Sequence, residues 1–110
     1  MAGTLHFERD GAIATLRMAN PPLNLLSREL LSELVGRCQD IAADESIRVV
    51  VVTGGPEVFS TGADLRAFHG IGPGDAREVA IAIQQAITGL ANLPQPTIAE
   101  IHGYCLGGGF

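Results

Sequence analysis

The sequence contains no lysine, and all seven of its basic residues are arginines. Without lysine, these 110 residues cannot supply the phosphate-binding lysine of a Walker loop, a Schiff-base amine or a lysine general base. Twelve acidic residues outnumber the arginines and give a net charge of −5, which argues against general nucleic-acid binding. We therefore expect neither a nucleic-acid partner nor lysine-dependent chemistry.

Cysteine and histidine are also scarce. The two cysteines, Cys38 and Cys105, lie far apart and fit no metal-ligand or redox spacing, so we expect both to be buried, reduced thiols. The three histidines are scattered along the chain, and we expect each to be structural. The sequence therefore predicts no metal site.

Two further absences concern location and chemistry. No apolar run is long enough to cross a bilayer, and charged residues in the first ten positions exclude a signal peptide there. We expect a cytoplasmic protein without a membrane partner. A Gly-x-Ser-x-Gly motif is missing as well, so Ser60 is not predicted to be a nucleophile.

The residues that are present predict one packed α/β domain. Apolar residues make up 46% of the chain and charged residues 17%, a composition typical of a folded core. Segments 4–9 and 12–18, joined by Asp10 and Gly11, have the pattern of a β-hairpin. Ser27 is expected to cap a helix that runs to about Ala43 with an apolar stripe at helical spacing.

The second half of the chain repeats the alternation of strand and helix. The continuous apolar runs at 47–54 and 97–103 predict strands buried on both faces of a parallel sheet. Between them, a helix ending at residue 92 or 93 is predicted, with Asp75 and Glu78 as a capping box. Its core stripe is expected to contain Val79, Ala80, Ile83, Ile87, Leu90 and Ala91.

Two loops rich in small residues follow the predicted parallel strands. They are FSTGADL, residues 59–65, and GYCLGGG, residues 103–109. Ligands usually bind beyond the carboxyl ends of such strands, and two main-chain N–H groups converging there would form an oxyanion hole. The same residues fit a structural role: Gly62 could supply a turn, Asp64 a helix cap and the glycine triplet close packing.

Four stretches resemble the enoyl-CoA hydratase/isomerase family, the crotonase superfamily, in order and spacing: NPPLNLLS, IRVVVVTG, VFSTGADL and PTIAEIHGYCLGGG. The resemblance implies a crotonase-like α/β spiral of repeated β-β-α units, of which residues 1–110 are the N-terminal part of one domain and therefore incomplete. It implies acyl-CoA thioesters of fatty acid metabolism as substrates, with no cofactor beyond their coenzyme A. It also implies a homotrimer or homohexamer for the full-length protein.

The resemblance assigns roles by position. Ala63 matches the first oxyanion-hole donor and Gly108 the second, so their N–H groups would stabilise the thioester oxygen during enolate formation. The acyl-CoA site would be lined by Ala63, Asp64, Leu65, Arg66 and Gly108. Among these, Asp64 would act as a helix cap, and Arg66 would face either a CoA phosphate or solvent. The PPLN segment would lie along the nucleotide and pantetheine arm.

In hydratase members of this family, both catalytic glutamates follow the residue that matches Phe110. The resemblance therefore predicts an enzyme of the hydratase/isomerase type whose acid–base residues lie beyond this chain. Hydration is the reaction expected first, although the family also isomerises, decarboxylates, dehalogenates and hydrolyses acyl-CoA. The alternative is a non-catalytic acyl-CoA-binding or subunit-interaction fragment of the same family, which the coding sequence after Phe110 would distinguish.

Overall fold

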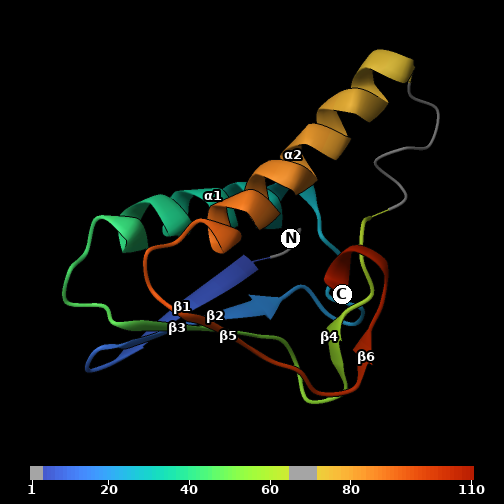
Figure 1. Ribbon diagram of the computed structural model, residues 1–110. Helices are drawn as coiled ribbons and strands as arrows, with labels where there is room; N and C mark the ends of the chain where they lie inside the picture. The colour runs from blue at the N-terminus through green and yellow to red at the C-terminus, as the bar shows by residue number, and fades with distance from the viewer. Residues whose placement is uncertain (1–3, 65–71) are drawn as a thin grey trace.

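The computed structural model describes residues 4–64 and 72–110, which form a sheet with two helices on one of its faces (Figure 1). The sheet has four strands in the order β1-β2-β3-β5. Strand β1 is antiparallel to β2, whereas β2, β3 and β5 run parallel to one another. The predicted α/β class is therefore confirmed.

The N-terminal hairpin is confirmed, with its turn one residue later than predicted. Strands β1 (Thr4–Asp10) and β2 (Ile13–Ala19) pair along their whole length. Asp10 lies opposite Ile13 next to the turn, and Thr4 lies opposite Ala19 at the other end. Gly11 and Ala12 form the connection, and Gly11 has φ +60°, a value that side chains disfavour. Every second residue of β2 from Ala14 to Met18 is buried, so one face of the hairpin contributes to the core.

Helix α1 (Arg28–Ala42) begins and ends where its sequence signals predict. The Ser27 hydroxyl caps the helix by accepting a hydrogen bond from Leu30 N at 3.2 Å. The predicted apolar stripe forms the largest helical share of the core, with Leu30, Leu31, Leu34, Cys38 and Ile41 buried. Helix α1 lies over the sheet beside α2 (Figure 1).

The two parallel strands of the second half differ in burial. Strand β3 (Val49–Thr53) lies between β2 and β5. Val50 and Thr53 are buried and the other three residues half-buried, so the predicted burial on both faces is confirmed only in part. Strand β5 (Thr97–Glu100) is shorter than predicted, and all four of its residues are exposed. The prediction of burial on both faces was wrong because β5 is the edge of the described sheet, paired with β3 alone.

Helix α2 (Pro73–Ala91) starts earlier than predicted and has no capping box. Gly72 is the N-cap and has no side chain to accept a capping hydrogen bond, while Pro73 has a φ suited to the first helical position. Asp75 therefore lies inside the first turn, and the predicted pairing with Glu78 is wrong. The helix ends at Ala91, one residue before the earlier of the two predicted ends. Of the predicted stripe, Ala80, Ile87 and Ala91 are exposed, and the buried residues of the helix are Val79 and Ala86.

Two short strands beside the main sheet were missed. Strands β4 (Val58–Ser60) and β6 (Tyr104–Cys105) pair in parallel as a second, two-stranded sheet. Figure 1 shows them next to each other, with the C-terminal turn above them. This small sheet is what brings the two predicted loops together, because one loop follows each of its strands.

Candidate functional site

The first loop leaves β4 at Ser60, and hydrogen bonds hold it against the segment before α1. Ser60 is fully buried, and its hydroxyl donates to Asn24 O at 2.8 Å while accepting from Gly62 N at 3.1 Å. Leu26 N donates to Gly62 O at 2.9 Å, and Leu26 and Ala63 form an isolated parallel β-bridge. Gly62 has φ +103°, which explains the need for glycine at this bend.

The second loop follows β6 and forms a single 3₁₀ turn, η2 (Gly107–Gly109). Leu106 N donates to Ser60 O at 3.0 Å, which fastens the start of the turn to the end of β4. A Cβ on Gly109 would collide with the backbone of Ser60, so only glycine allows this approach. The Cys105 thiol donates to Gly109 O at 3.3 Å and closes the turn.

The two amides predicted as oxyanion donors lie next to each other. The amide nitrogen of Ala63 is 3.8 Å from the position that a Cβ would take on Gly108. Within residues 4–64 and 72–110, no protein oxygen accepts a hydrogen bond from either N–H. Ala63 is half-buried and Gly108 exposed, so an external oxygen can reach both. Two adjacent N–H donors that no described oxygen accepts have the form of an anion or oxyanion site.

An apolar cavity of about 240 Å³ extends to the glycine triplet. Ser60, Gly108, Gly109 and Phe110 line it together with apolar side chains from the sheet and both helices. None of the described residues that line it carries an ionisable side chain. The cavity can therefore receive an apolar chain beside the N–H pair, but it supplies no acid or base of its own.

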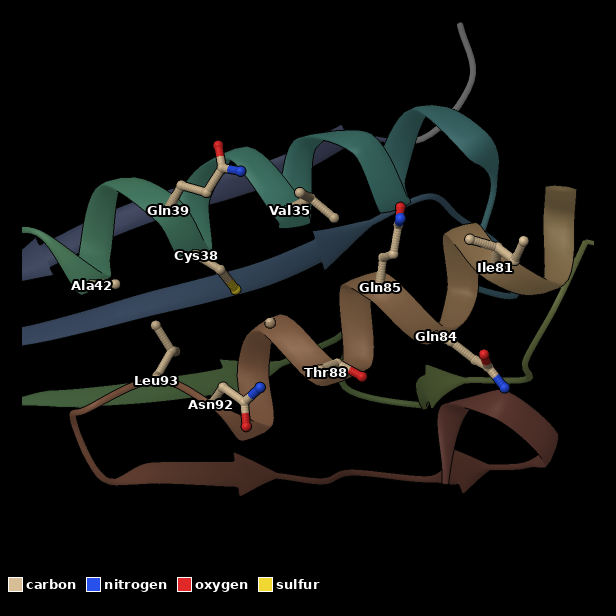
Figure 2. A pocket seen from close by; sticks show the side chains of 11 residues that line it. Val35, Cys38, Gln39, Ala42, Ile81, Gln84, Gln85, Thr88, Asn92 and Leu93 are labelled. Atoms are coloured by element: carbon tan, nitrogen blue, oxygen red, sulfur yellow. The ribbon is translucent and has the colours of Figure 1, made fainter.

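A larger cavity lies elsewhere, between α1 and α2. It measures about 540 Å³, and Figure 2 shows Cys38 of α1 directing its sulfur toward α2. Burial raises the pKa of the Cys38 thiol above its ordinary 9.0, which favours the unreactive protonated form. The lining is uncharged and contains neither of the unpaired amides, so we regard it as a groove between helices.

The other predicted site residues are placed only in part. Asp64 is half-buried and directly follows Ala63, whereas Leu65 and Arg66 lie outside the described residues. The prediction that Asp64 caps a short helix also falls on residues outside the described part of the chain. Both cysteines are free thiols, Cys38 buried and Cys105 half-buried.

Sequence reasoning missed the part played by Asn24 and Ser60. Asn24 is buried at φ +50°, a backbone region that asparagine tolerates better than most residues. Its Nδ2 donates to Val58 O and Phe59 O, both at 3.1 Å, and so holds β4. The sequence signal that could have predicted a turn at Asn24 is the pair of prolines shortly before it, Pro21 and Pro22.

Two other kinds of site were sought in the described part of the chain. Histidine, cysteine, aspartate and glutamate side chains form no group there that could hold a metal ion. None of the helices described combines the length and hydropathy needed to cross a bilayer.

Comparisons with known proteins identify relatives of this chain. The family model described as enoyl-CoA hydratase/isomerase matches residues 8–110. A probable enoyl-CoA hydratase from Mycobacterium avium is 34% identical over 101 residues, which are 92% of this chain and 39% of that protein. The chain thus spans about two fifths of the length of this relative.

Solved structures give the same result. Pseudomonas aeruginosa DspI matches with a TM-score of 0.92 and 37% identity, over 96% of this chain and 43% of that one. The human mitochondrial delta3-delta2-enoyl-CoA isomerase matches with a TM-score of 0.89 and 33% identity, over 96% and 42% of the two chains. The fold described here therefore corresponds to part of each of these larger proteins.

Proposed function

The chain belongs to the enoyl-CoA hydratase/isomerase family, and from this premise we propose that it polarises the carbonyl group of an acyl-CoA thioester. The N–H groups of Ala63 and Gly108 would donate to the thioester oxygen, and the cavity beside them would take the acyl chain. The observation that supports this most directly is the adjacent pair of amides, neither of which donates to an oxygen of the described residues.

The chemistry follows from where negative charge develops. When a proton leaves or a nucleophile adds to an enoyl thioester, charge accumulates on the carbonyl oxygen as an enolate. Two fixed N–H donors stabilise that oxygen more strongly than the neutral carbonyl, so they lower the barrier as well as binding the substrate. Hydration and double-bond isomerisation both pass through such a species, and the N–H pair serves either reaction.

Proton transfer must be provided by groups other than those that line the cavity, since no described residue there is ionisable. Acid–base assistance typically contributes about 10²–10⁴-fold to a rate. We therefore propose that residues 1–110 contribute the oxyanion hole and part of the acyl-CoA site of a hydratase or isomerase. For the whole protein we retain the homotrimer or homohexamer and the cytoplasm as predictions.

The test compares Gly108→Pro with Gly108→Ala. Crotonyl-CoA labelled with ¹³C at the carbonyl carbon is bound to each protein, and the carbonyl stretching frequency is measured by infrared spectroscopy. Polarisation by the hole lowers this frequency relative to free crotonyl-CoA. Proline removes the N–H donor, so we expect Gly108→Pro to lose most of the shift.

Gly108→Ala is the matched control because it retains the N–H. Its Cβ would lie 3.3 Å from Leu26 Cδ1, which can move aside, so we expect most of the shift to persist. In a longer, catalytically active protein that contains this chain, loss of one donor should lower kcat by about 10²–10³-fold. A folded Gly108→Pro protein with the full carbonyl shift would contradict the assignment.

A further inference from the structure

The direction of the Ala63 N–H is set by the peptide group that it shares with Gly62. Pro21–Pro22 is the cis peptide recorded among the described residues, so the Gly62–Ala63 peptide is trans. In a trans peptide the C=O and N–H bonds point in opposite directions. Leu26 N donates to Gly62 O at 2.9 Å, so the Ala63 N–H points away from the segment before α1.

A buried hydroxyl also holds the bend at Gly62. Ser60 Oγ accepts from Gly62 N and donates to Asn24 O, so it connects the bend to the segment that contains Leu26. The exposed fraction of Ser60 is 0% and that of Asn24 is 5%, so water does not compete with these bonds. Asn24 in turn binds two carbonyls of β4 through Nδ2.

We infer that Ser60 is a positioning residue whose buried hydroxyl aims the Ala63 N–H at the thioester oxygen. Its bond to Gly62 N occupies the one amide of the bend that would otherwise compete for the substrate oxygen. Its bond to Asn24 O keeps Leu26 at the distance that orients the Gly62–Ala63 peptide. This inference rests on the proposed oxyanion hole, but its geometric part can be measured without substrate.

The experiment uses Ser60→Ala in the 110-residue chain labelled with ¹⁵N. The orientation of the Ala63 N–H is measured from its residual dipolar coupling in a weakly aligned sample. The carbonyl stretching frequency and the dissociation constant of crotonyl-CoA are measured on the same proteins. Thr53→Val is the matched control, because Thr53 is also fully buried and its hydroxyl donates to Glu100 O in the main sheet.

We expect Ser60→Ala to change the Ala63 coupling while the couplings of β1 to β3 stay as in the wild type. With one of two donors misdirected, the carbonyl shift should fall by about half or more, while the dissociation constant changes much less. Thr53→Val should leave both the coupling and the shift unchanged. If the role of Ser60 is purely structural, Ser60→Ala and Thr53→Val will both lower the stability, and neither will change the Ala63 coupling or the carbonyl frequency.

The remaining outcomes separate this inference from the proposed function. An unchanged Ala63 coupling in Ser60→Ala overturns the positioning role, and so does a changed coupling with the full carbonyl shift retained. A changed coupling in a protein whose wild type shows no carbonyl shift supports the positioning role and contradicts the oxyanion hole. Should Ser60→Ala not fold, Ser60→Cys decides, because sulfur accepts hydrogen bonds weakly and should lose part of the shift.

Discussion

Gly62 and Gly108 serve the site for different physical reasons. Gly62 has a positive φ, and a Cβ there would lie 3.0 Å from Gly108 N and 3.1 Å from Leu106 O. A Cβ on Gly108 would meet the end of the Leu26 side chain at 3.3 Å and no backbone atom closer than 3.8 Å, so the backbone tolerates alanine there. The first glycine is thus required by the backbone, whereas the second contributes its N–H and can be replaced by alanine.

We predict that Gly62→Ala destabilises the chain by about 1–3 kcal/mol, because a side chain at this φ is strained and crowds two backbone atoms. Gly36→Ala is the control: it lies in α1 with no atom within 4 Å of the new Cβ, so it should stabilise by about 0.4–1 kcal/mol. Urea denaturation followed by circular dichroism measures both. Equal stabilities for the two variants would show that the bend at Gly62 is not strained by a side chain.

At the residue scale, the sequence predicted the two donors but not the bonds that hold them. Ala63 and Gly108 stand in motifs whose glycines and order along the chain are visible without a structure. The bond from Ser60 to Asn24 joins residues 36 positions apart, and only the folded backbone brings them together. Their functional roles remain predictions that the experiments above address.

At the element scale, prediction succeeded where the determining contacts are local. Helix α1 has a serine cap, an apolar stripe and no competing signal, and its predicted bounds are confirmed. Helix α2 begins at Pro73, two residues before Asp75, which was predicted to be its cap. Strands β4 and β6 are too short to show a periodic pattern, and the exposure of β5 depends on which elements cover it.

The turn between α1 and β3 gives a prediction about pH. The side-chain and backbone hydrogen bonds from Ser46 lower the pKa of Asp44 below its ordinary 3.8, with a smaller contribution from Arg9. A lowered pKa in the folded state adds stability above the unfolded pKa, and this stability is lost as pH falls through the folded value.

We therefore expect the free energy of unfolding of the wild type to fall more steeply than that of Ser46→Ala as the pH is lowered below about 4. The variant lacks the hydroxyl that contributes most to the lowered pKa, so less stability is left to lose. Chemical denaturation across this pH range measures the difference. Parallel pH profiles for the two proteins would rule out this role of Ser46.

At the scale of the whole molecule, apolar side chains gather near the C-terminal segment. Ile98, Ile101, Tyr104, Leu106 and Phe110 are each about half exposed or more, and Phe110 is 98% exposed. Strand β5 adds an edge without a partner among the described strands. Apolar residues on an open strand edge favour association with other chains.

We predict that the 110-residue chain self-associates as its concentration rises, and that Ile98→Lys reduces the association. A charge on the edge strand opposes pairing with another edge. Ser32→Lys adds the same charge on the exposed side of α1 and should leave the association unchanged. Light scattering over a concentration series decides the matter. A monomeric wild type at every concentration would contradict the prediction, as would equal effects of the two lysines.

The small sheet of β4 and β6 has a consequence for the timing of folding. It joins strands of three and two residues that lie more than 40 positions apart, and its register shifts between Val58 and Ser60. Closing so long a loop costs entropy that so few hydrogen bonds barely offset. We therefore expect the N–H pair to be among the last features to assemble and the first to open, while the hairpin, α1 and β3 stay folded. A ligand that bridges both amides would close this region, so part of its binding free energy would be spent on completing the fold.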